Sequence, residues 1–266
     1  EEIQKEVMAK QMDVLYDKRT KMEVLDDLID SGVEAYPNTF PMHLLKSNGL
    51  TAQKGRIYPL GGISNSTTIF SNEAGYYPII ETDEHGFNNP KGLYIENKVD
   101  IVLTGDSFTE GYSVHSNESI SAVLRQLDFN VISIGKGGNG SLLELAALKE
   151  YAEPLKPKIV LWVYFVNDLN DLEWEMKSSI LRKYLNEDDY SQNLISRQEE
   201  INGVLINYVQ SERGKIRRER EKKLKKLRII NLLKLFELRK MINLRPTPTP
   251  TPMFRDILQK SKQMVS

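Results

Sequence analysis

Residues 100–111 read DIVLTGDSFTEG, so an apolar stretch runs directly into a glycine, an acid and a serine. Asp100–Thr104 has the length and the apolar character of a short buried strand. Gly105 permits a tight turn after it, and Ser107 then lies beyond the carboxyl end of that strand. Open α/β sheets bind their ligands at this edge. The stretch therefore predicts an α/β fold with a candidate nucleophile at the edge of its sheet.

Two further apolar stretches repeat the arrangement downstream. Residues 130–134 read NVISI, and residues 159–165 read IVLWVYF, which is apolar throughout. Helical patterns lie between the three strands, over Ser119–Leu127 and Ser141–Ala152. Apolar strands that alternate with helices are typical of a parallel sheet covered on both faces. The sequence therefore predicts the α/β class with a parallel sheet.

The segment after the second strand is rich in glycine. Residues 134–140 read IGKGGNG, which lets the backbone approach a ligand closely. Gly135, Gly137 and Gly140 also match the dinucleotide spacing G-x-G-x-x-G, but the acidic residue expected about 20 positions later is absent. The structural alternative is a loop that needs glycine to let a helix pack on the sheet.

Asn167 and Asp168 follow the third strand and place an amide at the same predicted edge. Together with the Ser107 hydroxyl and a glycine N–H, this amide would give a nucleophile and two oxyanion donors. The structural alternative for both polar turns is helix capping, for which Asp, Ser and Asn are well suited. The three segments are weak signals singly and more specific as an ordered set.

This ordered set resembles the SGNH (GDSL-type) hydrolases, a family of lipases and esterases. Gly105-Asp106-Ser107 is similar to the first block of that family, Gly138 to the glycine of the second, and Asn167 with Asp168 to the third. Phe165 stands where the third block normally has glycine. Residues 83–90, DEHGFNNP, look like the segment that precedes the first block in some bacterial members.

The resemblance implies a flavodoxin-like three-layer α/β/α fold and hydrolysis of carboxylic esters through an acyl-enzyme. It assigns Ser107 as the nucleophile and Gly138 and Asn167 as the oxyanion hole, with Gly105, Asp106 and Asp168 as structural neighbours. The substrate is a small acyl or acetyl ester, on a carbohydrate or a lipid by analogy. No cofactor and no metal is expected.

A serine nucleophile needs a base, and the resemblance places it in a C-terminal Asp-x-x-His block. No histidine follows His115, so that block is absent and the chain is either a fragment or a degenerate, non-catalytic relative that binds a ligand. An alternative general base is His85, upstream of Ser107, with Asp83 as its partner. His115 is expected at most at the rim of the site, and His43 is expected to be structural. The 266-residue chain by itself is expected to be nearly inactive.

The chain shows signs of incompleteness at both ends. A three-stranded parallel sheet that ends on its most apolar strand leaves a hydrophobic edge open, whereas about four to six strands are usual. We therefore expect further strands beyond Ser266. The chain also begins without Met inside a helical pattern, so we expect the N-terminus upstream. Localisation stays open: the cell envelope if an anchor precedes the chain, and the cytoplasm otherwise.

The net charge of −1 conceals a division along the chain. Residues 1–210 carry a net charge of −13, and residues 211–266 carry +12. With the hydropathy pattern, this divides the chain into a helical segment, an irregular lead-in with short strands (Tyr77–Thr82 among them), the α/β core, a basic helix, and a Pro-rich linker with a short helix. The five segments are residues 1–32, 33–98, 99–210, 211–244 and 245–266.

The basic segment, residues 213–240, has two interpretations. A basic amphipathic helix binds an anionic membrane surface, whereas a solvated helix with its leucine-rich end against the body needs no partner. Few aromatic residues are available to stack on bases, so no nucleic acid is expected. The absence of Cys excludes disulfides, thiolate metal sites and a cysteine nucleophile. No apolar run is long enough to span a membrane.

Overall fold

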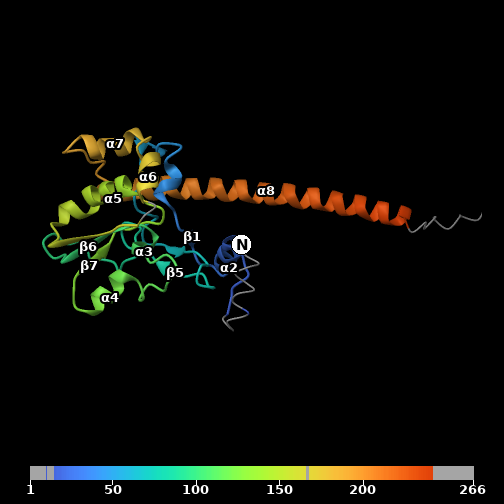
Figure 1. Cartoon of the computed structure of the whole chain (residues 1–266), viewed down its shortest axis with the longest axis horizontal. Coiled ribbons are helices and arrows are strands. Elements are labelled where there is room, and N and C mark those ends of the chain that lie inside the picture. Colours follow the sequence, from blue (N-terminus) through green and yellow to red (C-terminus); the bar gives the residue numbers. More distant parts are fainter. Residues whose placement is uncertain (1–9, 11–14, 166–167, 242–266) are drawn as a thin grey trace, which may run out of the picture. The chain divides into compact units, whose positions relative to one another are not determined.

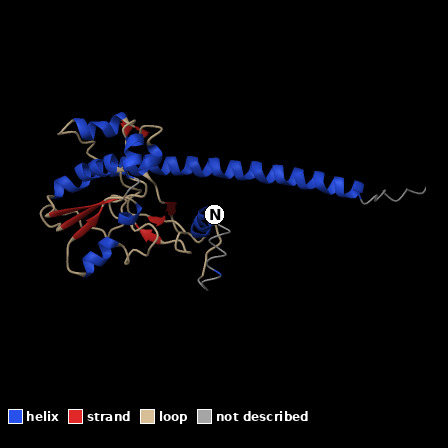
Figure 2. Ribbon diagram, in the orientation of Figure 1, coloured by secondary structure: helices blue, strands red, loops and turns tan. Residues whose placement is uncertain are grey.

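The fold, seen in a computed structural model, mixes helices with a small parallel sheet (Figure 1, Figure 2). The structure describes Lys10, residues 15–165 and residues 168–241, with side chains up to residue 226 apart from that of Leu169. The chain forms two compact units, Glu1–Ser211 and Glu212–Ser266. The candidate site lies entirely in the first unit.

The central sheet contains the three strands that the apolar stretches predict. They are β6 (Ile101–Gly105), β7 (Val131–Ser133) and β8 (Ile159–Val163), in the spatial order β7-β6-β8. Both pairings are parallel, and the register places Gly105 beside Val163. The parallel α/β prediction is therefore confirmed for this sheet, with strand ends that differ by one or two residues.

Helices lie on both sides of the sheet (Figure 1). The helix α4 (Ile120–Gln126) contacts β7, and α5 (Ser141–Ala147) contacts β6 from the other face. The predicted helix over Ser141–Ala152 is correct in position, but its second half, Leu148–Ala152, has the wider π-helical turn. A single helical turn, α3 (Ser107–Glu110), follows β6 directly. Helices therefore flank the parallel sheet on both sides, as the alternation of strands and helices predicts.

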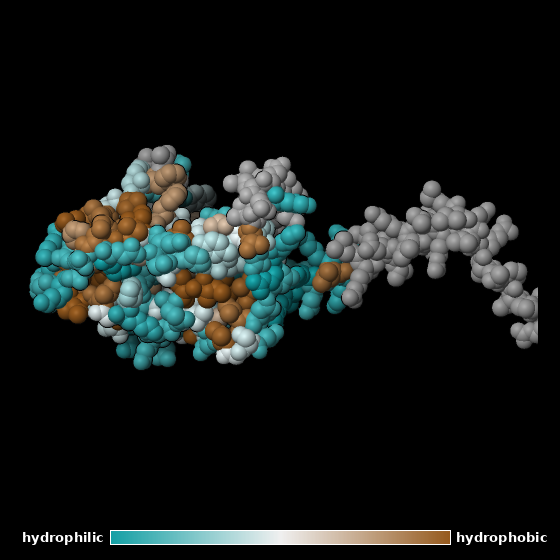
Figure 3. Space-filling view, turned by 90° about the horizontal axis from the view of Figure 1, so that it is seen from below, coloured by the Kyte–Doolittle hydropathy of each residue, from teal (hydrophilic) through white to brown (hydrophobic). Residues whose placement is uncertain are grey.

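The sequence predicts a sheet that is covered on both faces, and this prediction is wrong at β8, whose side chains are exposed. The side chains of Ile159–Trp162 are 39–50% exposed, although their register partners on β6 are buried. Tyr164 and Phe165, next along the chain, are each 49% exposed. Figure 3 shows apolar surface, in brown, interrupting the polar surface of one face. β8 is therefore the open apolar edge that the sequence led us to expect.

An open apolar edge favours association between chains. We expect Val160→Lys to reduce concentration-dependent self-association, because a charge on an edge strand opposes pairing with another chain. Light scattering over a concentration series measures this. Leu127→Lys is the matched control, because Leu127 is an exposed apolar side chain at the end of α4 and not on the edge strand. Equal association of all three proteins would contradict the expectation.

The helix predicted for the N-terminal segment is not continuous in the described residues. α2 covers Lys21–Asp30, and residues 15–20 are not helical. Thr20 caps the helix by accepting from the N–H of Glu23, while the Glu23 carboxylate accepts from the N–H of Thr20. This reciprocal capping box fixes the start of the helix. Ser31 is the C-cap of the helix, and Gly32 follows it with a φ of +86°. Residues 1–9 and 11–14 of the predicted helix lie outside the described residues.

The irregular lead-in forms two small sheets. A three-stranded sheet has the order β1-β4-β5, and its last strand confirms the one predicted over Tyr77–Thr82. A separate hairpin joins β2 to β3. The strands are β1 (Ala35–Pro37), β2 (Leu50–Ala52), β3 (Gly55–Ile57), β4 (Thr67–Ile69) and β5 (Ile79–Glu81), and Pro41–Leu44 forms a 3-10 helix. Ile57, Tyr58 and Phe87 share one apolar core with Val102 of the central sheet.

The C-terminal helices follow β8. They are α6 (Asp168–Glu175), α7 (Ser179–Asn186) and α8 (Gln198–Met241). The basic helix predicted over residues 211–244 therefore begins earlier, at Gln198. Its first turns are amphipathic, because Ile201, Leu205 and Val209 are buried in the main core. The predicted boundary at residues 210/211 consequently falls within a continuous helix.

Beyond residue 214, the described side chains of α8 are exposed up to residue 226. None of the helices in the described ranges is both long enough and apolar enough to cross a membrane. The membrane contact of the basic segment stays a prediction. The Pro-rich linker and the short helix predicted within residues 245–266 lie outside the described residues.

Candidate active site

Ser107 lies where β6 turns into α3. Gly105 is required at this turn, because a Cβ there would lie 2.7 Å from the carbonyl oxygen of Val163 on the neighbouring strand. Asp106 caps α3, since its Oδ1 accepts from the N–H of Phe108 at 2.9 Å. The capping interpretation of Asp106 is thus confirmed. Ser107 is the first helical residue, and its side chain is half-buried.

The glycine-rich loop meets the same strand end. The N–H of Lys136 donates to the carbonyl oxygen of Gly105 at 3.2 Å, so the loop continues the hydrogen-bonding pattern between β7 and β6. Gly138 has a φ of +73°, which disfavours any residue with a Cβ. A side chain at this position would also collide with the sulfur of Met42. The fold therefore brings the turn of Ser107 and the loop of Gly138 to one edge.

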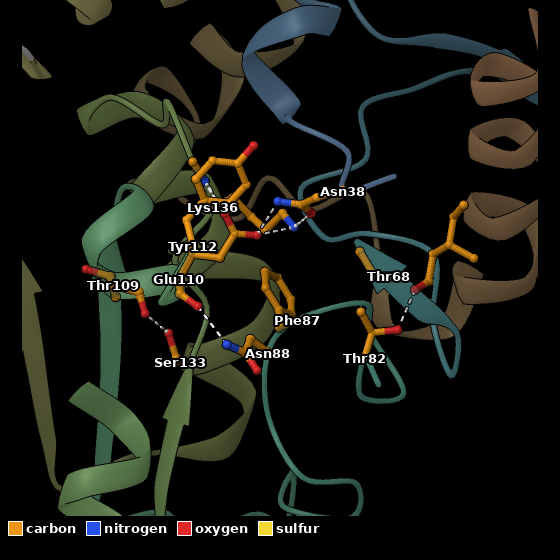
Figure 4. Close-up of polar contacts among 12 residues, drawn as sticks. Asn38, Thr68, Thr82, Phe87, Asn88, Thr109, Glu110, Tyr112, Ser133 and Lys136 are labelled. Carbon is orange, nitrogen blue, oxygen red and sulfur yellow. Dashed lines mark hydrogen bonds and ion pairs between the residues drawn. The ribbon is translucent and has the colours of Figure 1, made fainter. Parts of the chain in front are cut away.

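A buried ion pair fixes this loop to α3 (Figure 4). Lys136 Nζ lies 2.6 Å from Glu110 Oε1 and 2.6 Å from Asn38 Oδ1, and both charged side chains are 1% exposed. Asn38 Nδ2 also donates to Glu110 Oε1 at 2.9 Å. The other carboxylate oxygen of Glu110 accepts from the N–H of Gly137 at 2.7 Å. The residue next to Gly138 is thereby tied to the helix that begins with Ser107.

Hydrogen bonding around the turn leaves specific donors unused. The N–H groups of Phe108, Gly137 and Asn139 are taken by Asp106, Glu110 and Lys136, respectively. By contrast, the N–H groups of Ser107 and Gly138 have no hydrogen-bond partner within the described part of the chain. The Ser107 hydroxyl has none there either. These are the groups that a tetrahedral oxyanion and its nucleophile would need.

The residues that follow β8 lie at the same carboxyl edge of the sheet. Asp168 is fully buried; its Oδ2 accepts from the N–H of Phe165 at 2.7 Å, and its own N–H donates to the Phe165 carbonyl at 3.1 Å. Burial raises the pKa of Asp168. The ring of Phe165, where the resemblance expects glycine, packs on Phe108 with centroids 5.5 Å apart. Asn167, the predicted amide donor, lies outside the described residues.

Glu175 occupies the N-terminus of α5. This fully buried carboxylate accepts from the N–H of Gly140 at 2.7 Å and from the N–H of Leu142 at 2.8 Å. Burial raises its pKa to about 7. A dinucleotide would place its pyrophosphate on these same N–H groups. The dinucleotide interpretation of the glycine loop is therefore disfavoured, because the chain supplies its own anion there.

Glu144 is a second buried acid at this edge, on α5. Its Oε2 accepts from Trp162 Nε1 at 2.6 Å, while Oε1 has no partner among the described residues. Burial raises its pKa to about 8, and the nearby Asp168 and Glu175 act in the same direction. The surroundings of the turn are therefore acidic, and burial shifts the pKa values of Glu144 and Glu175 toward neutral pH.

We expect the stability of the protein to rise as the pH falls from about 8 to about 5. The folded-state pKa values of Glu144 and Glu175 exceed those of the unfolded chain, so the folded state binds more protons in this window. Each such group contributes a slope of about 1.4 kcal/mol per pH unit. This stabilisation is complete below the unfolded pKa and is lost as the pH rises through the folded pKa.

Glu144→Gln tests this linkage. Glutamine stays neutral and can still accept from Trp162, so we expect the variant to be more stable than wild type at about pH 8 and to depend less on pH. Urea unfolding at several pH values provides the measurement, with Glu199→Gln at an exposed position as control. Parallel stability curves for wild type and Glu144→Gln would show that the buried acid does not titrate as argued.

Asp83 and His85 do not form a catalytic dyad in this structure. Asp83 Oδ1 accepts from the main-chain N–H of His85 at 2.8 Å, and Oδ2 accepts from Tyr94 at 2.9 Å. Burial raises the pKa of Asp83 to about 6. The His85 ring packs against Tyr94 and Tyr151, and its Nδ1 has no partner in the described chain. The carboxylate therefore organises a loop and does not orient an imidazole.

That loop, residues 83–90, forms hydrogen bonds to the elements that carry the candidate site. Asn88 Nδ2 donates to the carbonyl oxygen of Glu110 at 2.9 Å (Figure 4). The Asn89 side chain donates to the Ser133 carbonyl at 2.8 Å and accepts from its N–H at 2.9 Å, which pairs it with the end of β7. Residues 83–90, which resemble the segment that precedes the first block in some family members, thus hold α3 and β7 in place.

The other two histidines differ in their relation to the site. His115 is exposed and stacks on Tyr76 with centroids 4.5 Å apart. His43, expected to be structural, is exposed and lines a cavity of about 750 Å³ that also includes Gly138. All three histidines are described, and none hydrogen-bonds to Ser107. Only the structure could show that His43 lies near the glycine loop, because its position comes from the fold of the lead-in.

Among the residues that the structure describes, no group of three or more His, Asp or Glu side chains is arranged to hold a metal ion. No family model and no curated protein matches the chain. Among solved structures, a mutant of the esterase AlinE4 is 18% identical over 64% of this chain and 95% of that chain, with a TM-score of 0.24. At that score the likeness carries no argument about activity.

Proposed function

We propose that the chain is a serine hydrolase of carboxylic esters, of the SGNH (GDSL) type, with Ser107 as its nucleophile. One observation carries the proposal. The Ser107 hydroxyl and the N–H groups of Ser107 and Gly138 lie at the carboxyl edge of a parallel sheet, without partners in the described chain. The buried pair of Lys136 and Glu110 supports it, because it holds the two segments in a fixed relation.

The proposed reaction proceeds in two steps. Ser107 Oγ bonds to the ester carbonyl carbon and gives its proton to a base, and the carbonyl oxygen becomes an oxyanion. The N–H groups of Ser107 and Gly138 donate to this oxyanion, with the Asn167 amide as the third donor that the resemblance implies. The C–O bond then breaks, the alcohol leaves with the proton, and water hydrolyses the acyl-enzyme. Each donor contributes about 2.7–4 kcal/mol to lowering the barrier.

The base of the proposed reaction is not assigned to any of the three histidines. None hydrogen-bonds to Ser107, and the rings of His85 and His115 are packed against tyrosines. We therefore propose that the 266-residue chain reacts slowly by itself and that imidazole in solution accelerates it. Exogenous imidazole provides a group whose pKa suits proton transfer near neutral pH.

The same observation favours a second candidate, a relative that binds a ligand at this edge without catalysis. It predicts that imidazole has no effect at Ser107. The two candidates separate in the hydrolysis of p-nitrophenyl acetate, measured with and without imidazole and corrected for the imidazole-only rate. The hydrolase predicts an added rate that Ser107→Ala abolishes and the exposed control Ser116→Ala retains. Equal rates of hydrolysis for wild type and Ser107→Ala would exclude the proposal that the chain is a serine hydrolase.

A further inference from the structure

The described part of α8 beyond residue 214 is a strongly basic surface. Residues 215–226 contain eight Lys or Arg and two Glu, which gives the segment a net charge of +6. All twelve residues are exposed. Because two carboxylates can neutralise at most two cations, the segment keeps an excess of positive charge even when both of its acids are paired. A surface of this kind attracts an anionic partner.

Exposed apolar residues lie among these cations. Ile216 and Leu224 are 48% and 51% exposed, and their separation of eight residues places them on the same side of the helix. Arg217, Arg220 and Lys223 follow one another at intervals of three residues, which places them beside the two apolar residues. Long basic side chains can keep their charged ends at a headgroup layer while apolar neighbours enter the layer below. This side of α8 therefore has the composition of a helix that lies on a membrane.

The remaining cations repel one another along the helix. Arg218, Lys222 and Lys226 follow at intervals of four residues, a spacing at which like charges destabilise a helix in water. The negative potential of an anionic bilayer extends over a Debye length of about 8 Å, which is comparable with the diameter of a helix. These cations are therefore also stabilised when another side of α8 lies on such a surface.

The sequence of α8 becomes more apolar further along. The helix continues to Met241, and nine of the fifteen residues from 227 to 241 are apolar. A helix that combines basic and apolar residues in this way is typical of the interface between headgroups and acyl chains. Nucleic acid would match the charge alone, because Phe236 is the single aromatic residue within 215–241 that could stack on a base. The combination therefore favours a lipid surface.

We propose that residues 215–241 of α8 bind the surface of an anionic membrane, with Ile216 and Leu224 toward the acyl layer and the basic side chains at the headgroups. The ligand class is a phospholipid with a net negative headgroup. The inference is independent of the proposed hydrolase, because it involves no residue of the candidate active site. Binding of this kind holds the chain at a membrane surface.

Vesicle sedimentation tests the proposal with the 266-residue chain. One set of vesicles contains phosphatidylcholine alone, and the other contains phosphatidylcholine and phosphatidylserine in equal parts. We expect binding to the second set only, because the attraction needs negative headgroups. We also expect binding to be largely lost when the salt concentration is raised from about 0.1 M to about 1 M, since the Debye length then falls from about 10 Å to about 3 Å.

A basic variant locates the electrostatic contact. Combined Arg217→Gln, Arg220→Gln and Lys223→Gln substitutions are expected to weaken binding to the anionic vesicles by about fivefold per cation, on the order of 100-fold in all. Glutamine favours helix, and circular dichroism checks that the helix remains. The matched control removes three exposed cations from the first unit: Lys54→Gln, Lys91→Gln and Lys98→Gln. This control is expected to bind the vesicles as wild type does.

An apolar variant tests the contact with the acyl layer. Ile216→Gln with Leu224→Gln is expected to weaken binding by about tenfold or more, because two apolar side chains then no longer leave water. The matched control is Ile95→Gln with Leu127→Gln, at exposed apolar positions of the first unit. Equal binding to both sets of vesicles, or a basic or apolar variant that binds as well as its control, would overturn the proposal. Tighter binding to duplex DNA at the same phosphate concentration would overturn it in favour of nucleic acid.

Discussion

Lys136→Met is expected to lower the free energy of unfolding by about 3–5 kcal/mol. The substitution leaves the Glu110 carboxylate buried without its cation, in a site where both side chains are 1% exposed. Asn38 would lose its bond to the ammonium as well. Methionine fills a similar volume, so the loss reflects an uncompensated charge more than a void. We also expect the loop of Gly138 to loosen, because Glu110 ties it to α3.

Urea unfolding of wild type and variants measures this effect. Lys158→Met is the matched control: Lys158 pairs with Asp100 at 2.7 Å, but its side chain is 73% exposed, so a loss of at most about 1 kcal/mol is expected. The double substitution Glu110→Leu with Lys136→Met removes both charges and is expected to recover much of the stability. A Lys136→Met variant as stable as the Lys158→Met control would show that the buried pair is not a structural anchor.

The strands of the central sheet were predictable because each is a short, continuous apolar run between turn residues. The chain around Ser107 was predictable for the same reason, since a glycine turn after such a strand leaves few alternatives. The exposed edge at β8 also followed from the sequence. It depends only on the number of strands and on the apolar character of residues 159–165.

Helix limits were less predictable, because local contacts decide them. Within the helix expected over the first 32 residues, residues 15–20 are not helical, and α2 begins at Lys21, where Thr20 and Glu23 cap it. α8 begins at Gln198, well before the basic pattern that suggested a helix from residue 211. Hydrophobic spacing identifies a helix, but its ends depend on which cap forms.

The supporting residues of the candidate site could not be found from sequence spacing. Asn38 and Lys136 are 98 positions apart, and Lys136 in the glycine run gave no sign of a buried partner. Asp83 and His85 suggested a general base and its carboxylate partner because they are only two positions apart in the sequence. In the structure, the Asp83 carboxylate instead accepts hydrogen bonds from main-chain N–H groups and from the Tyr94 hydroxyl. Proximity in the chain does not determine which atoms of two residues meet.

Ser107→Ala is expected to abolish reaction with a fluorophosphonate, a probe that bonds covalently to an activated serine oxygen. The argument depends on position, because Ser107 lies at the turn after β6 beside two N–H groups without partners in the described residues. Alanine removes only the hydroxyl oxygen, and that oxygen makes no hydrogen bond to any described residue. The fold is therefore expected to be unaffected, and equal unfolding curves for wild type and Ser107→Ala check this.

The most direct measurement is the position of the phosphonyl adduct, mapped by peptide mass spectrometry after labelling with and without imidazole. The account predicts an adduct on Ser107 whose formation imidazole accelerates, which is absent from Ser107→Ala and retained in Ser116→Ala. A folded chain that gives no adduct on Ser107 in the presence of imidazole, or that labels equally after Ser107→Ala, would contradict the assignment of Ser107 as the nucleophile.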